Sequence, residues 1–191
     1  MTRIAPASLL TICLVALGLA SPGLSVAAAE TATATAAGST TAAEWHPQQL
    51  NFTYNGFTTL YSCDGIEGKV RSILLTFGAR KDLTVRATGC FEGSLRPSRF
   101  AYVRAEFSTL APATEPGAAG AVKSAWVKVQ IAPNRPDFMG AGECELVEQM
   151  RDLLQKGFTL RNVDYRTTCV PHQVSMADYS VTAEVLKSSA P

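Results

Sequence analysis

Four cysteines mark two segments of the chain that share one pattern. The run 63–80 begins with Cys63 and the run 144–161 begins with Cys144, and the two align without a gap in their acidic, apolar, phenylalanine and arginine positions. The next cysteine is Cys90 after the first run and Cys169 after the second, at nearly the same spacing. The sequence therefore predicts two related halves, each bounded by a pair of cysteines.

Each half is predicted to run strand, helix, strand. Residues 56–62 are rich in aromatic and β-branched side chains, which favours a strand before Cys63. Apolar residues then recur with the period of a helix. They are Ile66, Val70, Ile73, Leu74 and Phe77 in the first half, and Leu146, Val147, Met150, Leu153, Leu154 and Phe158 in the second. Gly78 is expected to end the first helix, and strands are expected over 83–88 and 162–168.

Carboxylates occupy the first turn of both predicted helices. Asp64 and Glu67 resemble a capping box, and Glu145 and Glu148 repeat the spacing. Acid–base catalysis or cation binding by these pairs is the alternative. Capping explains them more simply, because a carboxylate is stabilised by the positive end of a helix.

The repeat also favours one of the three possible cysteine pairings. In a right-handed crossover the strands before and after the helix are parallel, so their carboxyl ends lie on one side of the sheet. This geometry favours Cys63–Cys90 and Cys144–Cys169. A strand inserted between the two parallel strands could separate the Cα atoms by more than ~7 Å, and the bond would then need bent strand ends.

Further alternating segments complete the predicted sheet. They cover residues 100–110, 126–131 and 179–185. We therefore expect an α+β fold with two layers: a mixed sheet of five to seven strands with two helices on one face, similar to a ferredoxin-like double βαβ with additions.

The amino-terminal region has the layout of an export signal. Residues 1–29 contain Arg3, an apolar run and the small residues Ala27 to Ala29, as in a secretory signal peptide. Residues 30–44 are almost entirely Ala, Thr, Ser and Gly, and we expect a disordered linker there. Residues 45–191 are then one disulfide-stabilised domain in the periplasm or outside the cell, with no stable membrane span after signal cleavage.

Charge gives little indication of a partner. Residues 45–191 carry 16 basic and 14 acidic side chains without a run of either sign. This balance argues against nucleic acid as a partner.

The segment Tyr61-Ser-Cys-Asp-Gly65, followed by Glu67 and the first helix, resembles short exported proteins of Gram-negative bacteria that have no assigned activity. The resemblance covers most of residues 57–172. It implies a compartment rather than a chemistry.

Catalytic motifs are missing from the sequence. It contains no Gly-x-Ser-x-Gly, no phosphate-binding loop with Lys, no His-Glu-x-x-His and no Cys-x-x-Cys. Only two histidines are present, His46 and His172, so the sequence offers few residues from which a catalytic histidine dyad or triad could be built. We assign no catalytic or cofactor-binding residue and expect a non-enzymatic domain.

The order Cys169, His172, Met176 is typical of a blue-copper ligand loop, as in plastocyanin-like cupredoxins. Such a centre needs a second histidine from a β-sandwich strand, and His46 beside the linker is the only candidate. A disulfide-bonded Cys169 would also be lost as a thiolate ligand. A weaker alternative keeps copper on His172 and Met176, with or without His46.

The main hypothesis is thus an exported domain with a partner-binding or structural role, whose partner is a protein or another cell-envelope component. The alternative is a copper-binding or metal-delivery protein that uses His172 and Met176.

Overall fold

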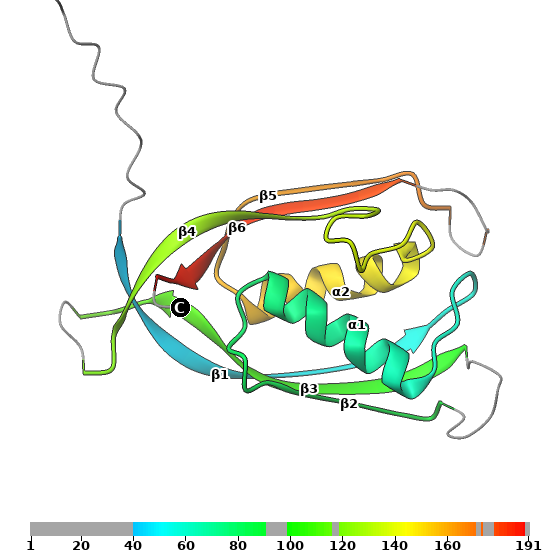
Figure 1. Cartoon of the computed structure of the whole chain (residues 1–191), viewed down its shortest axis with the longest axis horizontal. Coiled ribbons are helices and arrows are strands. Elements are labelled where there is room, and N and C mark those ends of the chain that lie inside the picture. The colour runs from blue at the N-terminus through cyan, green and yellow to red at the C-terminus, as the bar shows by residue number, and fades with distance from the viewer. Residues whose placement is uncertain (1–39, 91–98, 116–118, 171–172, 174–177, 190–191) are drawn as a thin grey trace, which may run out of the picture. The chain divides into compact units, whose positions relative to one another are not determined.

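The computed structural model describes residues 40–90, 99–115, 119–170, 173 and 178–189. They form two helices and one open sheet of six strands in the order β2-β3-β1-β4-β6-β5 (Figure 1). In chain order the elements are β1 (Thr41–Asn55), α1 (Cys63–Thr76), β2 (Thr84–Thr88), β3 (Phe100–Pro112), β4 (Val122–Ile131), α2 (Cys144–Gly157), β5 (Leu160–Thr167) and β6 (Tyr179–Ser188). The predicted α+β class and strand number are confirmed.

The predicted repeat reappears as a repeat of elements. Strand, helix, strand, strand runs from β1 to β3 and again from β4 to β6, and α1 and α2 begin at Cys63 and Cys144, which the repeat aligns. In each half the third strand pairs with both others, so β3 lies between β1 and β2 and β6 lies between β4 and β5. The inserted strand foreseen as an alternative is therefore present in both halves.

Every hydrogen-bonded strand pair of the described residues is antiparallel, so the prediction of a mixed sheet is wrong. Strands β1 and β2 are parallel to each other only because each pairs antiparallel with β3. The ferredoxin-like double βαβ is not confirmed, because the unit that repeats along the chain is strand, helix, strand, strand. A crossover between hydrogen-bonded parallel neighbours cannot form where the third strand occupies the place between them.

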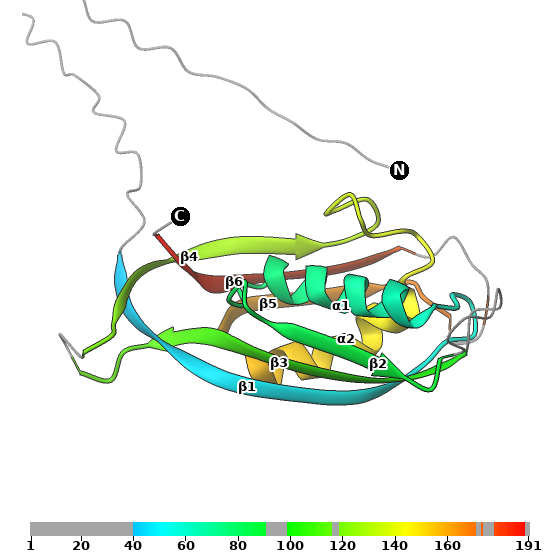
Figure 2. The same cartoon turned by 60° about the horizontal axis from the view of Figure 1, so that its bottom comes forward.

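The two half-sheets are joined by only a few paired residues. Strand β1 pairs with β3 over 13 positions but with β4 over only three, Thr41 to Ala43 with Val122 to Ser124. From this joint the half-sheets diverge, and both helices lie between them (Figures 1 and 2). The helices therefore share one face of the sheet as predicted, but the half-sheets enclose them rather than forming a flat second layer.

Two expected segments differ locally from the prediction. Strand β1 begins at Thr41 and so takes in the last four residues of the predicted linker, because Ala43 is fully buried against Leu110 and Leu186. Residues 56–62 form an irregular loop rather than a strand. The backbone groups of this loop bond to side chains of other segments, as described below.

The predicted helix stripes are confirmed as the centre of the core. Ile66, Val70, Ile73 and Leu74 of α1 are fully buried, as are Leu146 and Met150 of α2. Phe77 and Phe158, equivalent positions of the repeat, meet with ring centroids 5.8 Å apart, and Phe107 of β3 stacks on Phe158 at 5.5 Å. The two halves therefore share one core across their helix ends.

Gly78 ends α1 as predicted. Its φ of 92° lies in the left-handed region, and its N–H donates to Leu75 O at 3.0 Å while Ala79 N–H donates to Leu74 O at 3.0 Å. This is the usual glycine stop of a helix. A Cβ added to Gly78 would lie only 3.0 Å from Leu186 O.

We expect Gly78→Ala to destabilise the protein by about 2 kcal/mol or more, because a strained φ and a backbone clash add together. Gly120→Ala is the matched control, since Gly120 has a φ of 91° but no described atom within 4 Å of an added Cβ. It should lose only about 1 kcal/mol. Urea unfolding of the oxidised proteins measures both, and equal losses would show that the Leu186 contact is unimportant.

Candidate functional site

Both cysteine pairs lie where the helices begin. Cys63, the first residue of α1, is bonded to Cys90 just after β2, with Cα atoms 5.4 Å apart. Cys144, the first residue of α2, is bonded to Cys169 just after β5, with Cα atoms 6.0 Å apart. These are the pairs that the sequence repeat favoured. We call this part of the domain, with the loops 56–62 and 132–143, the disulfide end.

The inserted strands do not prevent these bonds, because the partner of each strand end is the start of a helix. A helix that crosses over the sheet brings its first turn above the strand that follows it, so neither bond requires the two parallel strands to be neighbours. Each closed loop, of 27 and 25 residues, should contribute about 3 kcal/mol by restricting the unfolded chain.

The predicted capping box is wrong in its details. The N-cap of α1 is Ser62, whose Oγ accepts from Gly65 N–H at 3.1 Å. Glu67 instead accepts from Ala87 N–H of β2 at 2.7 Å. The carboxylates of the second half also make contacts outside the helix start, since Glu148 accepts from the Tyr165 hydroxyl at 3.3 Å.

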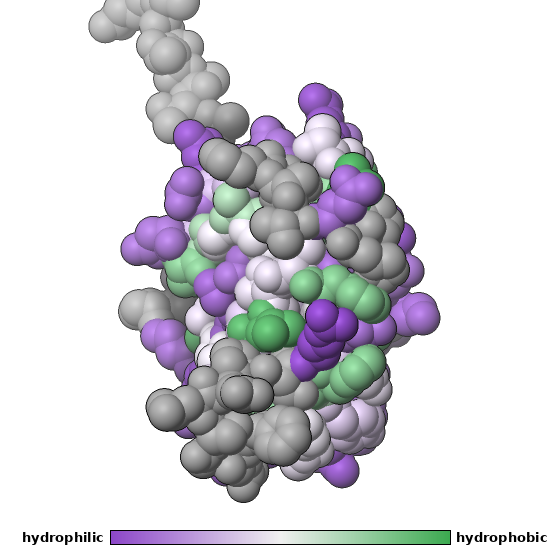
Figure 3. All heavy atoms as spheres, turned by 90° about the vertical axis from the view of Figure 1, so that its right-hand side faces the viewer, coloured by the Kyte–Doolittle hydropathy of each residue, from purple (hydrophilic) through white to green (hydrophobic). Residues whose placement is uncertain are grey.

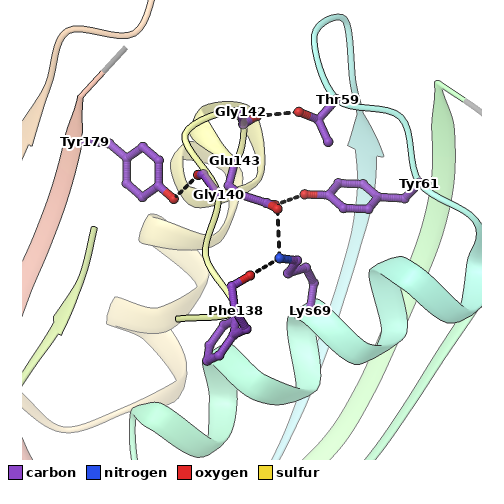
Figure 4. A network of polar contacts seen from close by, with 8 residues as sticks. All are labelled: Thr59, Tyr61, Lys69, Phe138, Gly140, Gly142, Glu143 and Tyr179. Atoms are coloured by element: carbon purple, nitrogen blue, oxygen red, sulfur yellow. Dashed lines mark hydrogen bonds and ion pairs between the residues drawn. The ribbon is translucent and has the colours of Figure 1, made fainter. Parts of the chain in front are cut away.

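A buried carboxylate at the start of α2 is the centre of a polar network (Figure 4). Glu143 is only 7 % exposed, and it accepts a short hydrogen bond from the Tyr61 hydroxyl. Its Oε1 lies 2.9 Å from Nζ of Lys69, which comes from α1 and also donates to Phe138 O. The network thus joins α1, the loop 56–62 and the loop 132–143.

Burial sets the protonation behaviour of this network. It raises the pKa of Glu143 from an ordinary value of 4.5 to about 7, and it lowers the pKa of Lys69. The hydroxyls of Tyr54 of β1 and Tyr179 of β6 also have raised pKa values. Burial is the main cause for both, followed by the charges of Glu145 and Glu143 for Tyr54 and by the charge of Glu143 for Tyr179. The loss of hydration therefore outweighs the attraction between Glu143 and Lys69.

The network could in principle supply an acid and a base, but its geometry favours a structural role. Glu143 and Tyr61 are both buried and bonded to each other, and Lys69 is held by two oxygens. A catalytic pair needs room for a reacting atom within hydrogen-bonding reach. These side chains are occupied by one another, so we interpret the network as a clamp between the two loops.

The loop 56–62 has no regular secondary structure, but hydrogen bonds to other segments hold most of its residues in place. Glu145 Oε2 accepts from Phe57 N–H at 2.8 Å and from Thr58 N–H at 3.0 Å. The Tyr54 hydroxyl donates to Thr59 O at 2.6 Å, and the Thr59 hydroxyl donates to Gly142 O at 2.5 Å. The carboxylate that the sequence suggested as a helix cap therefore holds a loop of the other half.

Apolar side chains are exposed on and beside this fixed loop. Phe57 is 37 % exposed, Leu60 40 % and Phe100, at the start of β3, 56 %. The guanidinium of Arg99 lies 5.8 Å from the Phe57 ring centroid. Figure 3 views the domain from this side, where hydrophobic and strongly hydrophilic side chains lie next to one another.

The structure does not test the proposed copper ligands as a group. His172 and Met176 lie outside the described residues, and Cys169 is disulfide-bonded. His46 is exposed in β1, opposite Thr109 of β3. Within the described ranges there is no group of three or more His, Cys, Asp or Glu side chains that could hold a metal ion.

Comparisons with protein-family models, curated proteins and solved structures find no significant match to the chain. Within the described residues, neither helix has the length and apolar character that crossing a membrane requires.

We expect the stability of the protein to fall as pH rises from about 4.5 to about 7. The folded state binds the Glu143 proton more tightly than the unfolded chain does, so this contribution is complete below the unfolded pKa and disappears as pH rises through the folded pKa. Glu143→Gln should flatten this part of the profile, measured by urea unfolding at each pH.

Glu106→Gln is the control, because that carboxylate is exposed on β3 and its loss should leave the slope unchanged. A Glu143→Gln profile that is parallel to the wild-type profile would contradict the raised pKa.

Proposed function

We propose that the chain is an exported, non-enzymatic domain that binds a protein or cell-envelope partner through its disulfide end. The export signal at residues 1–29 and the two cysteine pairs support a periplasmic or extracellular compartment, where thiols are oxidised. The finer assignment to an exported family rests on the Tyr61-Ser-Cys-Asp-Gly65 resemblance alone.

The observation that carries this proposal is the exposure of Phe57 and Leu60 on a loop that is already rigid. Association is weakened when a loop must be ordered on binding, and a preorganised loop avoids this cost. Aromatic and aliphatic anchors surrounded by polar groups are typical of the side chains that dominate binding energy. Here Glu145, Tyr54 and Gly142 hold the loop while its apolar side chains face outward.

A photoreactive amino acid placed at Leu60 tests the proposal in cells that export the protein. We expect a discrete covalent adduct at Leu60 and none at Val127, which is similarly exposed at 38 % but lies on β4. Phe57→Ala should reduce the adduct severalfold, because it removes a neighbouring anchor. The same yield at both positions, or no adduct at Leu60, would reject the disulfide end as a binding surface.

The alternative function, copper binding by His172 and Met176, is supported by their order in the sequence after Cys169. It predicts that the mature protein shows no free thiol when it is denatured without reduction, and that the native protein nevertheless takes up one Cu ion. His172→Ala should then weaken copper binding by about tenfold or more, whereas His46→Ala should not. Equal copper uptake by wild type and His172→Ala would exclude this site.

A further inference from the structure

At the other end of α1 from its disulfide lies an apolar groove with a volume of about 720 Å³. The end of α1, the start of β1 and the end of β6 form its walls. Its apolar lining comes from Trp45, Leu75, Gly78 and Ala79, and its charged lining from Arg71, Arg80, Lys81 and Lys187. Among the described residues no acidic side chain lines it, so all four charges in the groove are positive.

Two of these cations are already engaged. Arg71 donates to Leu83 O at 2.6 Å and to Lys81 O at 3.1 Å. Arg80 pairs with Asp82 at 2.7 Å, and its guanidinium lies 5.7 Å from the Trp45 ring centroid. These contacts fix the sides of the groove and cover one part of the indole.

Lys187 is different because it is half-buried and has no anionic partner in the described part of the chain. It follows Tyr179, Val181, Ala183 and Val185 in the row of β6 side chains that face the core. Its side chain passes Gly78 at the end of α1, since its Cγ would lie 3.4 Å from a Cβ at that position. Burial lowers its pKa, and no described acidic side chain forms an ion pair with it.

An ordinary structural role for Lys187 would be to bond the last carbonyls of α1. The other half shows such a bond, because the Thr109 hydroxyl of β3 donates to Gly157 O at the end of α2, at 3.0 Å. Among the described residues, Lys187 makes no corresponding hydrogen bond. Lys187 therefore brings to the groove a positive charge that no described carboxylate or carbonyl neutralises.

We propose that this groove binds an anionic amphiphile, with the anionic head group at Lys187 and the apolar chain along Trp45, Leu75 and Ala79. The volume is in the range of small-ligand sites, and a partly apolar lining with a few charged groups is typical of them. The carboxylate or phosphate head group would supply the anionic partner that Lys187 lacks among the described residues. This site lies at the opposite end of α1 from the proposed partner surface and does not depend on it.

Titration calorimetry of the purified chain with dodecanoate tests the proposal. We expect saturable binding of about one molecule per chain, and at least about tenfold weaker binding by Lys187→Met, because a charge-assisted contact is lost. Lys187→Arg should keep most of the affinity, and Lys128→Met, which removes an exposed lysine of the neighbouring β4, should bind like wild type.

The neutral amphiphile dodecyl maltoside separates charge recognition from simple apolar binding. It should bind more weakly than dodecanoate and should not respond to Lys187→Met. The proposal is overturned if dodecanoate does not bind at ~1 mM or binds Lys187→Met and wild type equally. It is also overturned if the neutral compound binds as tightly as dodecanoate.

Vesicles of anionic phospholipid distinguish the two sources of such a head group. Cosedimentation that is lost in Lys187→Met identifies a bilayer lipid as the ligand, whereas binding of free dodecanoate without cosedimentation identifies a single amphiphile taken into the groove. Cosedimentation that is the same for wild type and Lys187→Met, without dodecanoate binding, would reject the site.

Discussion

The contact between Phe77 and Phe158 holds together a domain whose sheet is weak at its centre. Strands β1 and β4 share only three residue pairs, so backbone hydrogen bonds do little to fix one half-sheet against the other. The helices that end at these phenylalanines pack between the half-sheets, and the rings meet at 5.8 Å. Burial of large aromatic side chains gives the non-directional stabilisation that such a joint needs. The enclosed position of both helices is therefore a consequence of the narrow joint between β1 and β4.

The two halves share an architecture but differ at equivalent positions, and the differences give the domain its particular contacts. Ser62 caps α1, whereas its counterpart in the second half is Glu143, which makes no cap bond and is buried against Tyr61 and Lys69. Glu145, the counterpart of Asp64, binds the backbone of the loop 56–62. The second half therefore supplies the carboxylates that fix a loop of the first. An exact repeat would leave this loop without those bonds.

Sequence reasoning was most successful where local physics decides the outcome. The helix stripes, the Gly78 stop and the alternating strands depend on periodicity and on one backbone conformation, and the structure has them at the expected places. Strand order was not predictable in the same way, because a helix crossover is compatible with a strand inserted between its two parallel strands. The role of Glu143 was missed because its burial depends on Tyr61 and Lys69, which are distant in the chain. The repeat did contain a signal for a different contact, because Trp45 and Arg80 recur as Trp126 and Arg161. In the structure the guanidinium lies 5.7 Å from the ring centroid in the first pair and 3.8 Å in the second.

The two recurring tryptophan–arginine pairs differ in how closely the guanidinium approaches the ring, and the groove lies beside the looser pair. The Arg161 guanidinium lies 3.8 Å from the Trp126 ring centroid, whereas Arg80 pairs with Asp82 and lies 5.7 Å from the Trp45 ring centroid. At the end of each helix a core-facing side chain of the sheet lies nearby. Thr109 donates to Gly157 O at the end of α2. Lys187 lies beside the end of α1 and, among the described residues, forms no ion pair. A small hydroxyl can close the space beneath a helix end by bonding to it. A long cation that makes no such bond leaves a charged, partly apolar space, and this difference between the two helix ends is the physical basis for expecting a ligand at Lys187.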